Sequence, residues 1–283
     1  DEGFDAINQY DSVSGSKIKE ILNAKDVFGD EKYGINSYAF NQDQTVVLIY
    51  FNSLKIYRHS TRGDFKVVQL TNKQVIGVGK EAQYPTLNSK GTKLAYVKEN
   101  DLYVMDLMSQ KVKRITKDGE YNTIINGAVD WVYEEEFGMS KGFEWNSDGT
   151  RIAFYRFDES AVKQWQMTTY GKLYPDLYKF KYPKAGGSNS IVQVFIADAQ
   201  KGGCKLIDLN SDADQYIPRI KWTKNPNVLS VQRLNRLQNK WELLMVEGTN
   251  VQVSLEETNS RYVDITDDLF FLSDKKHMIV SSE

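Results

Sequence analysis

Residues 145–155 read Trp145-Asn146-Ser147-Asp148-Gly149-Thr150-Arg151-Ile152-Ala153-Phe154-Tyr155, a polar turn followed at once by strand-forming residues. Asn, Asp and Gly readily adopt the positive φ angles that a tight hairpin turn needs. β-branched and aromatic residues suit the strand that follows. The stretch therefore predicts a hairpin turn that leads into a short β-strand.

Similar units of a turn and a strand recur along the chain. They begin at positions 40, 87, 145, 222 and 272, so they are spaced by 47, 58, 77 and 50 residues. A period of about 40–50 residues with several short strands is typical of β-propeller blades. We therefore predict an all-β chain that forms part of a β-propeller. Strands are expected after the five turns at Val46–Phe51, Lys93–Val97, Arg151–Tyr155, Val228–Gln232 and His277–Val280.

Helical periodicity is scarce in the sequence. Ser16–Asn23 is one short helix candidate, and Tyr133–Phe137 is a candidate for a single helical turn. Two periods are too long for a plain four-stranded blade, and the longer one contains the tyrosine-rich stretch Asp158–Pro183. Insertions in repeat proteins often bind partners, although a longer surface loop would have the same spacing. The last strand ends close to Glu283, so we expect the chain to be a piece of a larger protein.

The composition limits the possible functions. The 283 residues carry 36 Lys and Arg against 38 Asp and Glu, a net charge of −2, which argues against a general nucleic-acid binder. The single cysteine, Cys204, excludes an intrachain disulfide and a zinc site built on several thiolates. No apolar run approaches about 18 residues, the length expected of a membrane-spanning helix. No metal or cofactor site is predicted.

The segment Gly138-Met139-Ser140-Lys141-Gly142 matches the pattern of a nucleophile elbow. An elbow needs a strand before the serine and a helix after it. Here an acidic run precedes the serine and strand-forming residues follow it, and His59 and His277 are the two histidines of the chain. We therefore interpret the segment as a glycine-rich loop.

The acidic run reads Asp130-Trp131-Val132-Tyr133-Glu134-Glu135-Glu136-Phe137. Like charges held close together repel each other, so such a cluster needs water or a cation beside it. A substrate ammonium offers three N–H donors, which suit a pair of carboxylates. A divalent cation would need further acidic ligands, and none recurs nearby at loop spacing. On this chemistry the run is either a solvated acidic turn or a cation-binding site.

The same run resembles the double-glutamate motif in the β-propeller of dipeptidyl peptidase IV-type serine peptidases. Further segments resemble that family in the same order along the chain, over residues 39–283: Tyr57–Ser60 around the substrate-binding arginine, Tyr182–Gly186 after the inserted arm, and Gln232–Asn239 in a strand and turn. The resemblance implies about five of eight propeller blades, an inserted arm near Asp158–Pro183, and a short helical turn that carries the glutamates.

The resemblance also implies roles for three residues. Glu135 and Glu136 would hold the free α-ammonium of a peptide substrate, and Arg58 would bind a backbone carbonyl near the N-terminus of that peptide. Fixing the amino terminus at a set distance from a nucleophile restricts cleavage to a short N-terminal unit. Residues 1–283 would therefore be the substrate-binding and gating propeller of an exopeptidase that removes X-Pro or X-Ala dipeptides. The catalytic triad would lie in a C-terminal α/β-hydrolase domain, and no catalytic residue is expected in this chain.

Two other functions stay open. A prolyl tripeptidyl aminopeptidase would use the same glutamates, and a non-catalytic propeller that binds peptides or proteins would need no triad. The family further implies peptide substrates with a free N-terminus, a homodimer of the full-length protein assisted by the arm, and no cofactor. The chain has one cysteine and no Asn-x-Ser/Thr site, which by analogy favours the bacterial periplasm or cell envelope.

Overall fold

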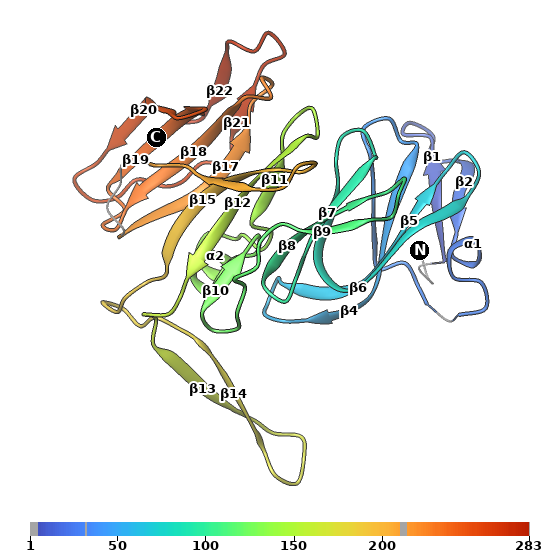
Figure 1. Ribbon diagram of the computed structural model, residues 1–283, viewed down its shortest axis with the longest axis horizontal. Helices are drawn as coiled ribbons and strands as arrows, with labels where there is room; N and C mark the ends of the chain where they lie inside the picture. Colours follow the sequence, from blue (N-terminus) through green and yellow to red (C-terminus); the bar gives the residue numbers. More distant parts are fainter. Residues whose placement is uncertain (1–4, 32, 210–213, 283) are drawn as a thin grey trace. The chain divides into compact units, whose positions relative to one another are not determined.

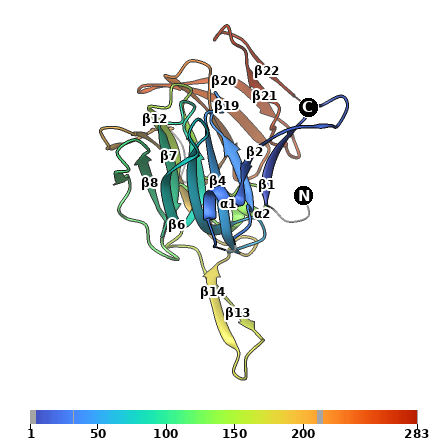
Figure 2. The same cartoon turned by 90° about the vertical axis from the view of Figure 1, so that its right-hand side faces the viewer.

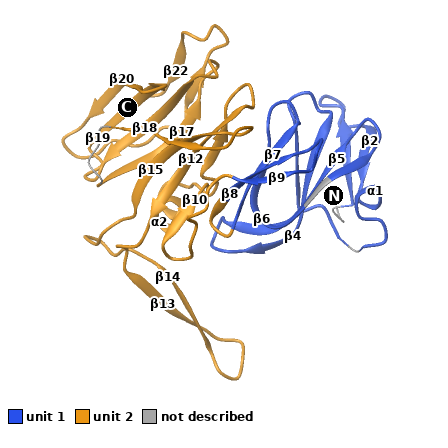
Figure 3. Cartoon of the chain, viewed as in Figure 1, with its two compact units in different colours: residues 1–98, 102–114 blue, residues 99–101, 115–283 orange. Residues whose placement is uncertain are grey.

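Antiparallel β-strands form nearly all of the regular structure in the computed structural model, which describes residues 5–31, 33–209 and 214–282 (Figure 1). The chain divides into two units, residues 1–98 with 102–114 and residues 99–101 with 115–283 (Figure 3). Within the described ranges, no helix is both long enough and apolar enough to cross a membrane.

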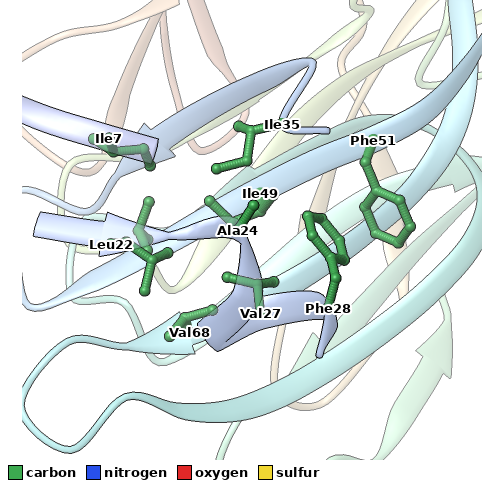
Figure 4. Packing of buried hydrophobic residues seen from close by; sticks show 10 residues of the cluster. Ile7, Leu22, Ala24, Val27, Phe28, Ile35, Ile49, Phe51 and Val68 are labelled. Carbon is green, nitrogen blue, oxygen red and sulfur yellow. The ribbon is translucent and has the colours of Figure 1, made fainter. Parts of the chain in front are cut away.

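Unit 1 begins with a hairpin and a short helix. Strand β1 (Ala6–Tyr10) pairs with β2 (Lys17–Asn23), and helix α1 (Ala24–Phe28) follows. The predicted helix at Ser16–Asn23 is wrong, because these residues pair with β1 and the helix begins only at Ala24. The pairing places Leu22 opposite Ile7, and both side chains are buried in a core with residues of α1 and of the adjoining blade (Figure 4).

The rest of unit 1 forms two blades that share one long strand. The first half of β6 pairs with β5 and its second half pairs with β7, so one strand closes the first blade and opens the second. The strand order of this sheet is β3 (Ser37–Phe40), β4 (Val46–Lys55), β5 (Thr61–Gln69), β6 (Gln74–Leu87), β7 (Lys93–Lys98), β8 (Asp101–Asp106) and β9 (Val112–Arg114).

Unit 2 contains two more blades and a final hairpin. The third blade comprises β10 (Ile124–Asn126), β11 (Phe143–Trp145), β12 (Arg151–Asp158), β15 (Ile191–Asp198) and β16 (Cys204–Leu206), and helix α2 (Trp131–Glu135) lies between β10 and β11 in sequence. The fourth blade has the order β17 (Gln215–Trp222), β18 (Val228–Asn235), β19 (Lys240–Glu247) and β20 (Asn250–Thr258). A hairpin of β21 (Leu269–Phe271) and β22 (Met278–Val280) follows. These sheets agree with the predicted partial propeller of about five blades.

The inserted arm is a separate hairpin of β13 (Gln164–Thr169) and β14 (Asp176–Lys181). It projects from the sheets of unit 2 in both views (Figures 1 and 2). Strands β12 and β15, which flank the arm in sequence, pair with each other over all eight residues. The arm therefore leaves the third blade without interrupting its ladder, and its hairpin lies within the predicted insertion Asp158–Pro183.

Buried asparagines fix the recurring hairpin turns. Asn41, Asn88 and Asn146 each accept two backbone N–H groups, four and five residues further on, at 2.9–3.0 Å. Each of the three side chains is at most 4% exposed. The residue three positions after each asparagine has a positive φ, as the turn chemistry predicts; these residues are Gln44, Gly91 and Gly149.

Candidate functional site

The glutamate motif lies in a loop, residues 127–142, whose two ends are tied together. The N–H of Gly142 donates to the carbonyl of Gly127 at 2.9 Å, and Ala128 pairs with Lys141 in an isolated bridge. A Cβ atom at position 142 would lie 2.6 Å from the carbonyl oxygen of Ala128, so the close backbone approach requires glycine there. The loop thus leaves the third blade and returns to it at fixed points.

Asp130 sets the start of helix α2 inside this loop. Its Oδ1 accepts the backbone N–H of Tyr133 at 3.0 Å, which is the bond of a helix N-cap. Its Oδ2 accepts the hydroxyl of Ser190, directly before β15, at 2.7 Å. Asp130 is 6% exposed, and this burial raises the pKa of its carboxyl. The N-cap therefore joins the helix to the strand that follows the arm.

Tyr133 ties the same helix to the fourth blade. Its hydroxyl oxygen accepts the backbone N–H of Ile217 at 2.8 Å. Its ring packs edge-on against Phe157, with 4.8 Å between ring centroids, and against Phe137 at 5.1 Å. The side chain is 2% exposed. Helix α2 is therefore held by strands from two blades of unit 2.

The three consecutive glutamates have different environments. Glu134 is buried at 1% exposure, Glu135 at the end of the helix is half-buried, and Glu136 at the C-cap is exposed. Gly138, with a φ of 63°, lets the chain turn away after the helix. The run is therefore not a uniformly solvated acidic turn, and its last two carboxylates are the ones within reach of solvent.

Glu136 borders an open pocket of about 770 Å³ at the base of the arm. The rings of Trp131 and Tyr182, whose centroids are 4.3 Å apart, line it together with Trp165. The ammonium of Lys184 lies 4.7 Å from the centroid of the Trp165 ring. An aromatic wall beside a carboxylate suits a ligand that carries a positive charge next to apolar groups.

Arg58 belongs to the other unit. It is exposed in the bend between β4 and β5, where the N–H of Ile56 donates to the carbonyl of Ser60 at 2.8 Å. The structure thus brings Glu135 and Glu136 together at one helix end in unit 2, whereas Arg58 lies in unit 1. The joint role of these three residues stays a prediction.

The Gly-x-Ser-x-Gly segment is a loop between a helix and a strand. Helix α2 precedes Ser140 and strand β11 follows it, the reverse of the order in a nucleophile elbow. The backbone explains why both positions are glycine: Gly138 has a positive φ, and Gly142 has no room for a Cβ atom. Among the described residues, no group of three or more His, Cys, Asp or Glu side chains is placed to hold a metal ion.

Comparison with known proteins shows the family of the chain. The profile of the dipeptidyl peptidase IV (DPP IV) N-terminal region matches residues 41–283, which include the glutamate helix. The chain belongs to the dipeptidyl peptidase IV family. Dipeptidyl peptidase 4 of Felis catus is 32% identical over 228 residues, which cover 75% of this chain and 30% of that protein. Dipeptidyl aminopeptidase B of Saccharomyces cerevisiae is 27% identical over 249 residues, with 84% and 30% covered.

A solved structure of the dipeptidyl peptidase IV family supports the same assignment. The crystal structure of Porphyromonas gingivalis dipeptidyl peptidase 4 superposes with a TM-score of 0.88 at 32% identity, and it covers 99% of this chain and 42% of that one. These relatives are dipeptidyl peptidases by name. The chain spans only about 30% of the length of the curated relatives described above.

Proposed function

We propose that this chain is the substrate-binding and gating part of a dipeptidyl peptidase IV-like serine exopeptidase that removes N-terminal X-Pro or X-Ala dipeptides. The observation that carries the proposal is the placement of Glu135 and Glu136 at the end of an anchored helix, where Glu136 borders a pocket. The names of the relatives support the release of dipeptides. The catalytic serine, aspartate and histidine belong, in this proposal, to a C-terminal α/β-hydrolase domain of a longer protein.

The proposed binding step is recognition of a free peptide N-terminus. The α-ammonium donates charge-assisted hydrogen bonds to the carboxylates of Glu135 and Glu136, and Arg58 donates to a peptide carbonyl. A peptide whose N-terminus is blocked brings no ammonium group to the two carboxylates, so these charge-assisted hydrogen bonds do not form and its binding is disfavoured. The anchor also sets which peptide bond reaches the nucleophile.

The double variant Glu135→Gln with Glu136→Gln in the intact protein tests the proposal. Glutamine keeps the shape of each side chain and removes its charge, so we expect kcat/KM for a Gly-Pro amide to fall by about 100-fold or more. Glu247→Gln, at an exposed position that ends β19, is the matched control. Unchanged turnover of the amide by the double variant would refute the proposal.

The same assay separates the alternative functions. Faster release from X-Y-Pro amides than from X-Pro amides would identify a prolyl tripeptidyl aminopeptidase. An intact protein that binds peptides but cleaves neither substrate would be a non-catalytic propeller. A location in the bacterial periplasm or cell envelope stays a prediction.

We further propose that the arm helps two copies of the intact protein to associate. Large apolar side chains are unusually exposed along the arm, and burial against a second copy would remove them from water. Their exposed fractions are 42% for Trp165, 47% for Met167, 85% for Tyr170, 91% for Leu173, 80% for Tyr174 and 55% for Leu177.

A further inference from the structure

We propose that Tyr133 and Asp130 are positioning residues that fix the direction in which Glu135 and Glu136 present their carboxylates. The inference rests on the proposed function of the two glutamates. Neither positioning residue lines the pocket beside Glu136, so each acts through the helix and not by touching a ligand there.

Helix α2 cannot hold its own position. It has five residues, whereas an isolated helix needs about 12–15 residues to be even marginally stable in water. Trp131, Val132 and Glu136 border an open pocket, where the ring of Trp131 packs against that of Tyr182. The contacts of Asp130 and Tyr133 with the neighbouring strands therefore help to set the orientation of the helix and of the glutamates that it carries.

The bond from Ile217 to Tyr133 is the longest-range of these contacts, spanning 84 residues of sequence. Ile217 lies where the β17–β18 ladder shifts register, between Tyr216 and Arg219, and the next residue is Pro218, which has no N–H. Ile217 is fully buried, and the hydroxyl of Tyr133 takes up its N–H. Removing that oxygen would leave a buried donor unsatisfied, so the structure strongly favours this one position of the tyrosine.

Tyr133 precedes the two glutamates by only two and three residues. A binding group must be held within about 0.5 Å of its productive position. A helix that loses its bond to β17 can shift or fray by more than this, because the pocket leaves room beside it. The carboxylates then sample several positions, and their average attraction for an ammonium group falls.

Asp130 controls the other end of the helix. Its two oxygens accept one bond from within the helix and one from Ser190, so the first turn is tied to the start of β15. An asparagine has one carbonyl oxygen for the cap and an amide that can meet the serine hydroxyl, so Asp130→Asn preserves most of this arrangement. Asp130→Ala removes it.

The test measures how much the ammonium group contributes to binding. The inhibition constants of a dipeptide competitor and of its analogue without the α-amino group are compared in the intact protein, and their ratio is the readout. Both inhibition constants are measured on the correctly folded molecules alone. Partial unfolding of a variant therefore lowers its total activity but does not change the ratio of the two constants. In the wild-type protein we expect a ratio well above 10.

Tyr133→Phe should lower this ratio by about 5–10-fold. Tyr155→Phe is the matched control, since it removes the same atom from a buried tyrosine whose ring centroid lies 6.2 Å from that of Tyr133. Within the described part of the chain, the hydroxyl of Tyr155 has no hydrogen-bond partner, so its loss should leave the ratio unchanged. Asp130→Ala should lower the ratio, and Asp130→Asn should restore most of it.

The outcomes separate the two proposals. A wild-type ratio near 1 refutes the role of Glu135 and Glu136, and the positioning role is refuted with it. A high wild-type ratio that neither Tyr133→Phe nor Asp130→Ala lowers overturns the positioning role alone. If Tyr133→Phe does not fold, the comparison of Asp130→Ala with Asp130→Asn decides the question by itself.

Discussion

The phenol oxygen of Tyr133 lies 2.8 Å from the backbone nitrogen of Ile217 and accepts its N–H. The register shift in β17 leaves the buried N–H of Ile217 without a partner in the strand ladder. The hydroxyl oxygen of Tyr133, from a loop distant in sequence, accepts this N–H instead. Burial raises the pKa of Tyr133 well above its ordinary value, so the hydroxyl stays neutral across the physiological range. Because the oxygen is the acceptor, this contact does not depend on the release or uptake of a proton.

The turn asparagines should contribute strongly to stability. Asn146→Ala removes the acceptor for the N–H groups of Thr150 and Arg151 at a site that is 1% exposed. We expect a loss of about 1–3 kcal/mol in the free energy of unfolding, measured by urea denaturation. Asn259→Ala, which removes a single bond to Arg261 at an exposed turn, should cost less than about 1 kcal/mol. Equal losses would contradict a special role for the buried turns.

Gly142 and Gly138 should respond differently to alanine. Gly142→Ala places a methyl group against the backbone of Ala128, which must move, so we expect a loss of several kcal/mol or failure to fold. Gly138→Ala meets no atom within 4 Å and suffers only from its positive φ, for a loss of about 1 kcal/mol. Thermal unfolding of the two variants gives the comparison. A greater loss at position 138 would show that the loop closure is not tight.

Glu159 should make stability depend on pH. Burial, and secondarily the nearby Asp130, raise its pKa from 4.5 to about 7, although Lys181 opposes the shift. Between these values the unfolded chain releases the Glu159 proton while the folded chain keeps it, so stability falls as pH rises through this window and levels off above it. The contribution is about 3 kcal/mol at most.

The variant Glu159→Gln removes this proton release. Its free energy of unfolding should therefore rise relative to the wild-type value as the pH is increased from 5 to 8. Glu247→Gln, at an exposed position, should show no such trend. If the free energies of unfolding of wild type and Glu159→Gln differ by the same amount at pH 5 and at pH 8, Glu159 ionises normally in the folded protein.

The arm should control association of the intact protein. Replacing residues 164–181 by a short turn removes the exposed apolar side chains but leaves the β12–β15 ladder in place. We expect light scattering after size exclusion to show a dimer for the wild type and a monomer for this variant. Tyr170→Ser with Tyr174→Ser should weaken the dimer partly. Dimers of unchanged stability would exclude a role for the arm.

The sequence predicts the blades well because their signal is local. Each turn and the strand after it lie within about ten residues, and the predicted strand at Arg151–Tyr155 is part of β12. The segment Ser16–Asn23, predicted as a helix, contains Ile18, Ile21 and Leu22, whose spacing also fits one face of a helix. In the structure Ile18 is 56% exposed, and pairing with β1 outweighs that spacing. The spacing of apolar residues within one segment does not show whether that segment pairs with another strand.

The candidate site, too, can be predicted only in part from the sequence. Its acidic run could be recognised from the sequence, but the helix begins at Trp131, two residues before the predicted turn Tyr133–Phe137, because Asp130 caps it. The partners of that turn could not be recognised, because Ser190 and Ile217 lie 60 and 84 residues from the groups that they contact. The sequence likewise shows that the asparagines are turn formers, but not that their side chains are buried and bind the backbone.

The unbroken ladder between β12 and β15 has a consequence for how the family can diversify. All eight residue pairs form although the arm lies between the two strands in sequence, so the arm is a connection whose ends are held together by the ladder. Doubling the length of such a loop costs only about 0.6 kcal/mol in closure entropy. Changes in the length of this segment should therefore cost the fold little stability, and its sequence is limited by the pocket at its base and by its proposed role in association.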